Sequence, residues 1–154
     1  MTRVGIISDT HGLVRPEAVA ALRGVDAILH AGDIGQPEVL AELRALAPLT
    51  AVRGNNDHGA WADGVPETAL VRFDGVAVYV LHDRGELRRA PAPAEARVVV
   101  AGHSHKPLVE ERDGVLYVNP GSAGPRRFRL PIAVAELAID GRAVRARIVE
   151  LAVR

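Results

Sequence analysis

The chain has 154 residues, which is enough for one hydrophobic core, so we expect a single domain over residues 1–154. Hydrophobic residues make up 48% and charged residues 25%, and a formal net charge of +0 gives no strong signal for nucleic acid or acidic membranes. The absence of cysteine excludes disulfides and thiolate metal sites. No segment reaches the ~20 apolar residues that span a bilayer, and no signal-peptide pattern opens the chain, so a cytoplasmic protein is expected.

The first half of the chain alternates predicted strands and helices. Short apolar runs rich in β-branched residues predict buried strands at 4–8, 26–30 and 49–53. Helical spacing between them predicts helices at 16–23 and 37–46, each opened by a proline, which suits the first helical turn. This β-α-β-α-β order predicts a parallel sheet with right-handed crossovers.

The second half is richer in hairpins. Asp-Gly pairs separate three pairs of predicted strands, which is a strong hairpin signal. These strand pairs are 68–73 with 75–82, 108–112 with 115–118, and 132–139 with 143–151. One more strand is predicted at 98–101, and the polar segment 86–95 is expected to be a loop with one helical turn. Together the two halves predict an α/β fold of two sheets packed face to face with helices outside.

A short motif of Asp, Asn or His follows five of these strands. Ligands of open α/β sheets bind beyond the carboxyl ends of the strands, so we expect the motifs to meet there. Glycines at 32, 54 and 102 are expected to let the backbone pass close to the site, where a Cβ would crowd it. The motifs are Asp9-Thr10-His11, Gly32-Asp33, Gly54-Asn55-Asn56-Asp57-His58, His82, and Gly102-His103-Ser104-His105.

The donor types in these motifs favour a divalent metal centre. Carboxylate, amide and imidazole donors without thiolate suit Mn, Fe, Zn or Ni rather than soft metals. Seven candidate ligands are too many for one ion with open positions, whereas two ions ~3.5–4 Å apart that share a carboxylate account for them. Such a pair makes a bridging hydroxide available near neutral pH and neutralises charge on phosphate oxygens. The candidate ligands are Asp9, His11, Asp33, Asn55, His82, His103 and His105.

The order of the five motifs resembles the calcineurin-like metallophosphoesterase superfamily. The short chain, with Val118-Asn119-Pro120-Gly121-Ser122 after the last histidine, resembles the small prokaryotic phosphodiesterase branch. The resemblance covers essentially the whole chain. It implies a four-layer αββα sandwich of two mixed β-sheets flanked by helices. It also implies two divalent metal ions, with Mn as the first candidate and Ni, Fe, Zn or Mg as the others. It also implies that Asp9, His11 and His105 hold the first ion, that Asn55, His82 and His103 hold the second, and that Asp33 bridges them.

The chain departs from the family at Asn56. Many relatives have a histidine there that is taken to protonate the leaving group, and asparagine has no proton to give at neutral pH. His58 is a candidate substitute, the alternative being an ordinary loop residue. Asp57 is expected either to orient the site or to cap its own turn. The expected catalytic residues are therefore Asn55, Asp57 and His58.

Several other side chains have alternative interpretations. Arg127, in a loop with Arg126 and Arg129, is a candidate phosphate clamp or part of a solvated loop, and Asn56 is the other candidate for substrate binding. His30 is expected to be a buried, hydrogen-bonded core residue or a support for a ligand. Trp61 is expected in an exposed loop, with a packing role favoured over a wall for a substrate base.

The sequence therefore predicts a dinuclear-metal phosphodiesterase that hydrolyses a small phosphodiester or nucleotide by attack of a metal-bridging hydroxide. The alternative is a catalytically weak protein-binding scaffold on the same fold, like the retromer-subunit relatives. The change at Asn56 favours the scaffold, and the complete donor set favours the enzyme. A cyclic-nucleotide hydrolase is a refinement of the first prediction. The physiological substrate, the native metal and any homo-oligomer are left open.

Overall fold

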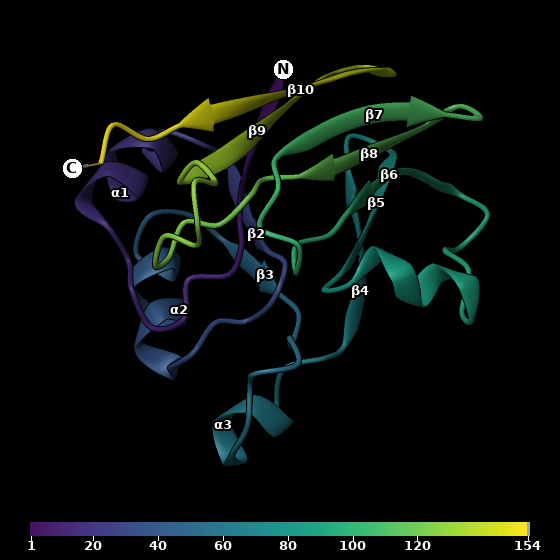
Figure 1. The fold of residues 1–154 in the computed structure, drawn as a ribbon. Coiled ribbons are helices and arrows are strands. Elements are labelled where there is room, and N and C mark those ends of the chain that lie inside the picture. The colour runs from purple at the N-terminus through teal and green to yellow at the C-terminus, as the bar shows by residue number, and fades with distance from the viewer. Residues whose placement is uncertain (154) are drawn as a thin grey trace.

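Two five-stranded sheets packed face to face form the centre of the computed structural model, which describes residues 1–153 (Figure 1). The strand order is β10-β9-β1-β2-β3 in the first sheet and β4-β5-β6-β8-β7 in the second. The first sheet contains β1 (Thr2–Ile7), β2 (Ala27–His30), β3 (Leu49–Ala51), β9 (Ala133–Asp140) and β10 (Ala143–Glu150). The second contains β4 (Thr68–Phe73), β5 (Val76–Leu81), β6 (Ala96–Val100), β7 (Leu108–Arg112) and β8 (Val115–Asn119).

The predicted parallel β-α-β-α-β unit is confirmed in the first sheet. Strands β1, β2 and β3 are parallel neighbours, connected by α1 (Pro16–Leu22) and α2 (Pro37–Arg44). In the register, Ile7 pairs with His30 and His30 pairs with Ala51, so the three strands end at the same edge. The segments that follow them therefore start side by side, although they are more than twenty residues apart in the chain.

Side-chain alternation along the strands of the first sheet serves two of the three buried clusters. Val4 and Ile6 of β1 face the second sheet and pack in one buried cluster with Leu29, Val78 and Val98. A second buried cluster lies under α1 and α2. Its members include Ile7, Leu22, Ile28 and Leu43. Because successive side chains of a strand point to opposite faces, a single apolar run such as 4–7 serves both layers.

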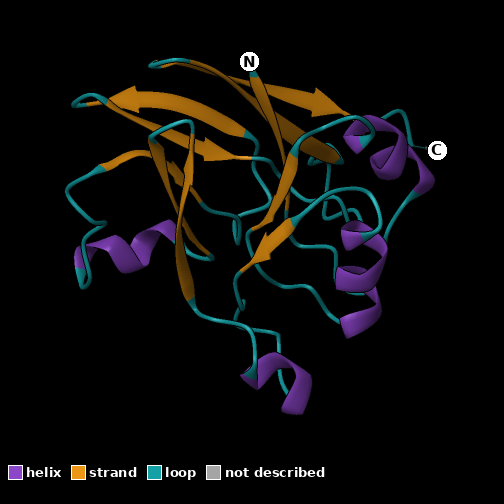
Figure 2. Cartoon of the chain, turned by 180° about the vertical axis from the view of Figure 1, so that it is seen from behind, coloured by secondary structure: helices purple, strands orange, loops and turns teal. Residues whose placement is uncertain are grey.

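The helical layer over the second sheet is thin. It consists of the 3-10 helix η1 (Arg84–Arg88) and the loop after it, seen in teal at the right of Figure 1. The side chain of Asp83 accepts a 2.9 Å hydrogen bond from the N–H of Gly85, and this cap starts the turn just before the predicted segment 86–95. Pro91 and Pro93 lack backbone donors, which prevents the turn from continuing as a helix. The αββα order is thus present, with its fourth layer reduced to one helical turn (Figure 2).

All three predicted hairpins are present. Asp74 and Gly75, like Asp113 and Gly114, have positive φ angles, which is the geometry of a two-residue type I′ turn. Strands β9 and β10 pair up to Asp140 and Ala143, so Gly141 lies in the third two-residue turn. In the described residues no helix is long and apolar enough to cross a membrane.

The expectation of an exposed loop around Trp61 was wrong. Residues 60–63 form the short helix α3 (Ala60–Asp63), and Trp61 is partly buried against the cluster beneath α1 and α2. Gly59 precedes the helix with a φ of 102°, which lets the chain turn back toward this core. The packing role for Trp61 holds, although its loop environment does not.

A buried hydrogen-bonded chain through His30 ties the ends of β1 and β2 together. The ring of His30 is fully buried, its Nδ1 accepts from the N–H of Gly32 at 3.0 Å, and its Nε2 lies 3.0 Å from the hydroxyl of Thr10. That hydroxyl donates to the carbonyl of Ile34 at 2.9 Å, so Nε2 must carry the proton and donate to it. This series of hydrogen bonds requires the His30 ring to be neutral. It confirms the prediction that His30 is a buried, hydrogen-bonded core residue.

Acidification should therefore destabilise the protein through His30. Burial lowers the pKa of His30 from 6.5 to about 4, against the opposing charges of Asp9 and Asp57. Between these two pH values the unfolded chain binds more protons than the folded one. The contribution of neutral His30 to the free energy of unfolding is therefore fully present above pH 6.5 and is lost as the pH falls toward 4. The total loss is about 3 kcal/mol.

Urea unfolding of metal-free protein at pH 7 and pH 5 tests this expectation. The free energy of unfolding of the wild type should fall between these pH values more steeply than that of His30→Asn, which cannot bind the proton. All other titrating groups are common to both proteins, so the difference in slope belongs to His30. Equal slopes would contradict the assignment.

Candidate metal centre

The predicted ligands gather where the carboxyl ends of strands from both sheets meet. Asp9 follows β1, Asp33 follows β2, His82 follows β5, and His103 and His105 follow β6. Backbone hydrogen bonds of 2.9 Å lock these segments together, from the N–H of Asp9 to the carbonyl of Gly32 and from the N–H of Gly102 to the carbonyl of His82. The two sheets therefore share one cluster of polar side chains at this edge.

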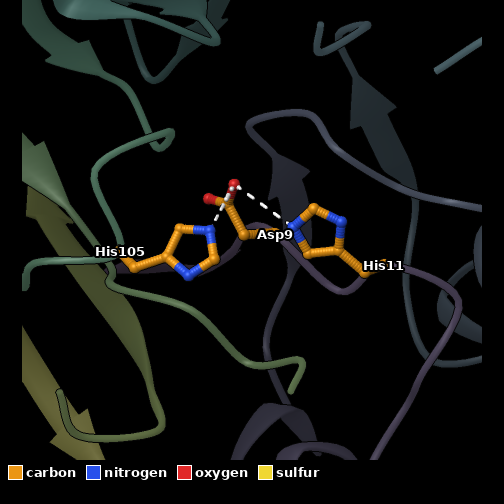
Figure 3. A group of neighbouring side chains, drawn as sticks. All are labelled: Asp9, His11 and His105. Carbon is orange, nitrogen blue, oxygen red and sulfur yellow. Dashed lines mark ion pairs between the residues drawn. The ribbon is translucent and has the colours of Figure 1, made fainter. Parts of the chain in front are cut away.

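The first group consists of Asp9, His11 and His105, whose donor atoms lie within 4.8 Å of one another. Figure 3 shows the carboxylate of Asp9 between the two imidazoles. Its Oδ1 is 3.3 Å from Nε2 of His105 and 4.0 Å from Nε2 of His11. These are the three residues predicted for the first ion.

The second group consists of Asp9, Asp33 and His82, again within 4.8 Å. Oδ2 of Asp33 lies 3.3 Å from Nε2 of His82 and 3.8 Å from Nε2 of His11. Oδ1 of Asp9 lies 3.9 Å from Nε2 of His82. Both carboxylates therefore lie between a histidine predicted for the first ion and one predicted for the second. Asp33 was the predicted bridge between the two ions. Asp9 also lies close to histidines predicted for both ions.

The other two predicted ligands lie on the open side of the cluster. Across residues 1–153, His103 joins neither group; its ring centroid is 5.1 Å from that of His82, and its Nε2 is 3.8 Å from Oδ2 of Asp83. Asn55 is exposed and lines a pocket of 390 Å³ together with His82 and His103. The structure thus brings five predicted ligands into tight groups and places two at the rim.

Four buried donor atoms of these residues have no hydrogen-bond partner among the described residues, although for His105 this atom is Nδ1, whereas its Nε2 is the atom that lies 3.3 Å from Asp9. A buried polar atom without a partner costs roughly 1–3 kcal/mol, so such atoms are rare unless something else satisfies them. All four belong to predicted ligands and are atom types that coordinate divalent ions. The donor set therefore fits a metal centre. The atoms are Oδ1 of Asp9, Nε2 of His11, Nε2 of His82 and Nδ1 of His105.

Hydrogen bonds from outside the cluster aim these atoms inward. Oδ2 of Asp9 accepts from the hydroxyl of Ser8 at 2.7 Å and from the N–H of His103 at 3.1 Å, which leaves Oδ1 free. Nδ1 of His82 donates to the carbonyl of Ala31 at 2.7 Å, so its Nε2 carries the lone pair that a metal needs. The side-chain orientation required for coordination is thus set by the protein alone.

The two carboxylates stay ionised inside the protein. Burial on its own would raise the pKa of Asp33, but the imidazole of His82 and two N–H groups of Asn56 outweigh burial and hold this pKa well below its usual range. Burial likewise opposes ionisation of Asp9, and the nearby His105 and the hydroxyl of Ser8 lower its pKa below the ordinary value. Both side chains are therefore anionic at neutral pH, as metal ligands must be.

The backbone at the ligands is strained. Asp9, His11, Asp33, His103 and His105 all have φ between 47° and 69°, in the left-handed region that costs side-chain-bearing residues roughly 1–3 kcal/mol each. Strain of this kind persists at functional sites because the surrounding structure holds it in place. Five of the seven predicted ligands share this conformation.

The predicted close approach at the glycines is confirmed. A Cβ on Gly102 would lie 2.1 Å from Oγ of Ser8 and 2.5 Å from Oδ2 of Asp9. A Cβ on Gly54 would lie 2.2 Å from Oδ1 of Asp33. Only glycine allows the neighbouring backbone to reach the buried carboxylates at these positions.

The residues of the third motif, Gly54-Asn55-Asn56-Asp57-His58, have different surroundings. The backbone and side-chain N–H groups of Asn56 donate to Oδ1 and Oδ2 of Asp33 at 2.9 and 3.0 Å, so Asn56 positions a ligand. Its predicted use in substrate binding would have to come from the second N–H of the side-chain amide or from the amide oxygen. His58 is exposed.

Asp57 was predicted to be catalytic, and its surroundings indicate a positioning role instead. Its carboxylate is buried and accepts hydrogen bonds from the N–H groups of Ile34, Gly35 and Gly54 at 2.9–3.1 Å. It therefore caps its own turn and also orients the neighbouring loop, which combines the two alternatives that the sequence left open. Both of its oxygens accept from backbone N–H groups, which favours the positioning role.

The arginines of the loop after Ser122 are all exposed. Arg127 and Arg129 are exposed, and in the described part of the chain neither side chain makes a hydrogen bond or ion pair. Arg126 donates to the carbonyl of Val153 at 3.4 Å. This environment favours the solvated loop over the phosphate clamp.

Sequence reasoning missed several supporting residues. Ser8 holds Asp9 through its hydroxyl. The hydroxyl of Ser122 donates to the carbonyl of Asp9 at 3.1 Å, and the amide of Asn119 donates to the carbonyl of Gly102 at 2.9 Å. The Asn119-Pro120-Gly121-Ser122 sequence carried a signal for the last pair, because it already stood out as part of the family resemblance.

Replacing Asp57 by alanine should destabilise the whole edge. Two buried N–H groups, of Ile34 and Gly54, and the partly buried N–H of Gly35 would lose their acceptor, which we expect to lower the free energy of unfolding by about 3 kcal/mol. The matched control is Asp63→Ala, an exposed carboxylate 3.7 Å from Arg53, where a loss below about 1 kcal/mol is expected. Urea unfolding measures both, and equal losses would show that Asp57 is not a structural support.

Comparison with known proteins agrees with this donor set. The chain is 37% identical over 158 residues to a probable metallophosphoesterase of Methanothermobacter thermautotrophicus, covering 95% of this chain and 91% of that protein. It is 30% identical over 138 residues to a phosphodiesterase of Methanocaldococcus jannaschii, covering 77% and 82% of the two chains. The solved structure of Vps29 from Chaetomium thermophilum has the same fold, with a TM-score of 0.78 at 17% identity over 98% of this chain and 100% of that one.

A family model also matches most of the chain. The calcineurin-like phosphoesterase superfamily domain matches residues 2–142, which include every strand that carries a predicted ligand. The order of the motifs, the two-sheet fold and this match agree. The chain belongs to the calcineurin-like phosphoesterase superfamily.

Proposed function

We propose that this protein is a phosphodiesterase that works with two divalent ions, Mn²⁺ first among the candidates. The observation that carries the proposal is the set of four buried, unpartnered donor atoms on Asp9, His11, His82 and His105. Family membership and the phosphodiesterase relative support a phosphoester hydrolase. The preference for diesters, the number of ions and the choice of Mn²⁺ are our own inferences.

Each ion would have its own set of residues. Asp9, His11 and His105 would hold the first, and His82, His103 and Asn55 would hold the second, with Asp33 shared. When bound, the ions would supply an activated hydroxide near neutral pH and neutralise charge on the phosphoryl oxygens. The rim position of Asn55 and His103 leaves the second set open toward the pockets, where a substrate can enter.

The residues of the third motif bear on which leaving groups the enzyme can expel. Asn56 is held against Asp33 by two hydrogen bonds and has no proton to give to a leaving group. His58 is exposed and is the remaining candidate donor in this motif. Esters whose leaving group is a weak base need this proton least, so we expect aryl diesters to react faster than alkyl phosphomonoesters.

The second candidate function is a protein-binding scaffold. The fold shared with Vps29 is compatible with it, but a likeness at 17% identity carries only the fold. A scaffold has no need of a buried carboxylate with an unsatisfied oxygen, Oδ1 of Asp9, and strained histidines around it. These features favour the enzyme.

Metal-dependent turnover is the direct test of the proposed function. Protein freed of metal should hydrolyse bis-p-nitrophenyl phosphate after addition of Mn²⁺, and faster than it hydrolyses p-nitrophenyl phosphate. Elemental analysis should find close to two ions per chain. Metal uptake without turnover with Mn, Ni, Fe, Zn or Mg would favour the scaffold.

A pair of substitutions separates the ligands from the exposed histidine. Asp33→Ala should reduce kcat by about a hundredfold or more, because it removes a donor between both groups. His58→Ala should reduce it by less than about tenfold if water can protonate the leaving group. Kinetics with bis-p-nitrophenyl phosphate measures both, and comparable losses would make His58 a central proton donor.

A further inference from the structure

The loop that leads into β9, yellow-green in Figure 1, carries exposed side chains that the metal centre does not use. Its segment 124–131, here called the Arg-Phe loop, reads Gly-Pro-Arg-Arg-Phe-Arg-Leu-Pro, with three arginines and no carboxylate. Because the whole chain has a formal net charge of +0, the remaining residues carry an excess of three negative charges. The positive charge of the Arg-Phe loop is therefore local, and the net charge of the chain does not reveal it.

Phe128 lies at the centre of the Arg-Phe loop and is open to solvent. It is 92% exposed, more than any other large hydrophobic residue that the structure describes. The N–H of Leu130 bonds to the carbonyl of Arg127 at 3.0 Å, so Phe128 lies in a tight turn, where its φ is 52°. Turns of this kind usually carry small or polar residues. A single exposed apolar side chain is common on proteins, so Phe128 supports an inference only together with its charged neighbours.

The arginines around Phe128 have no acidic partner. Among residues 1–153, Arg126, Arg127 and Arg129 form no ion pair. The hydrogen bond that their side chains make runs from Arg126 to the carbonyl of Val153 at 3.4 Å. Guanidinium groups that no carboxylate neutralises can bind the phosphate oxygens of a partner, often through two hydrogen bonds at once.

The base of the Arg-Phe loop is fixed to the segment that follows β1. A Cβ on Gly124 would lie 2.4 Å from the carbonyl oxygen of Asp9, so the two backbones are in close contact. The terminal nitrogen of Arg15 donates to the carbonyl of Gly124 at 3.1 Å and adds a fourth cation, again without an ion pair in the described part of the chain. Phe128 and the arginines are therefore presented together by a loop that is anchored at its base.

We propose that the Arg-Phe loop docks this protein onto an anionic membrane surface, with Phe128 between the lipid headgroups and the arginines against their phosphates. This docking is separate from the proposed catalysis and does not depend on it. Aromatic side chains favour the interface between membrane and water, and anionic lipids attract the cations beside them. The same lipids repel the remaining residues with their excess of negative charge, so the Arg-Phe loop is the side that turns toward the membrane.

Two other kinds of anionic partner fit the Arg-Phe loop less well. A specific protein interface buries more than about 1,000 Å² with matching shape, whereas this loop offers one aromatic ring and a few arginines. A site for single-stranded nucleic acid combines a basic groove with several rings for base stacking, and Phe128 is the only aromatic residue in the segment. A bilayer surface requires neither a groove nor a matching shape, because its lipids can rearrange around an inserted side chain.

Cosedimentation of the Mn-loaded protein with lipid vesicles tests this docking. We expect binding to vesicles of mixed phosphatidylglycerol and phosphatidylcholine, little binding to pure phosphatidylcholine, and weaker binding as salt is added. Phe128→Ser should weaken binding by at least about tenfold, because it removes a buried aromatic side chain. Arg127→Gln should weaken it by roughly fivefold, because it removes one cation near the surface.

The matched control for the charge is Arg145→Gln. Arg145 is an exposed arginine near the start of β10, whereas Val153, which Arg126 contacts, follows the end of that strand. Its replacement should change vesicle binding by less than about twofold, because the charge lies away from the docking loop.

A fluorescence measurement tests the insertion of residue 128 directly. The emission of Phe128→Trp should shift to shorter wavelength when mixed vesicles are added, whereas the wild type, whose Trp61 packs against the core, should show no shift. Absence of this shift, or equal vesicle binding by Phe128→Ser and the wild type, would overturn the docking surface. Equal losses in Arg127→Gln and Arg145→Gln would do the same, as would a single-stranded oligonucleotide that binds through Phe128 while vesicles do not. Protein that binds vesicles through Phe128 but hydrolyses no ester would refute the proposed catalysis and retain the docking surface.

Discussion

The fully buried carboxylate of Asp9 is the constraint on which the rest of the site depends. An ionised carboxylate inside a protein is unfavourable unless hydrogen bonds and opposite charges compensate it. Here Ser8 and the backbone of His103 satisfy Oδ2, while Oδ1 faces imidazoles from both sheets without a hydrogen bond in residues 1–153. A free buried oxygen of this kind is costly in an apoprotein and becomes favourable when a divalent ion supplies the missing charge.

The fold holds this unfavourable arrangement through connections that lie outside the cluster. Asp57 collects N–H groups from two loops, and His30 and Thr10 link the ends of β1 and β2. Gly54 and Gly102 let the neighbouring chain approach without a steric clash. These contacts hold the left-handed backbone conformation at the ligands. The energy that offsets this strain therefore comes from the packing of the two sheets and does not require a bound metal.

The site is asymmetric, and the asymmetry has a chemical meaning. The side around Asp9 and His105 is closed by β1 and the loop at Ser122, whereas His103 is nearly half exposed between two pockets. A closed side suits firm retention of an ion. An open side suits exchange of substrate and product.

Local sequence determined the strands, the three Asp-Gly hairpins and the identity of the donor residues, because side-chain periodicity and turn chemistry act over a few positions. The order of the motifs along parallel strands was also enough to predict that Asp9, Asp33 and His82 would meet. Tertiary structure decided what sequence spacing cannot encode. Asp57 became a support because N–H groups from a distant loop converge on it. Trp61 lies on a short helix rather than in the expected exposed loop, because α3 packs against the core. Arg84 lies over Tyr117 because β7 and β8 place Glu110 and Tyr117 beside it. Each of these roles depends on contacts between segments far apart in the chain, which exist only after the sheets have packed.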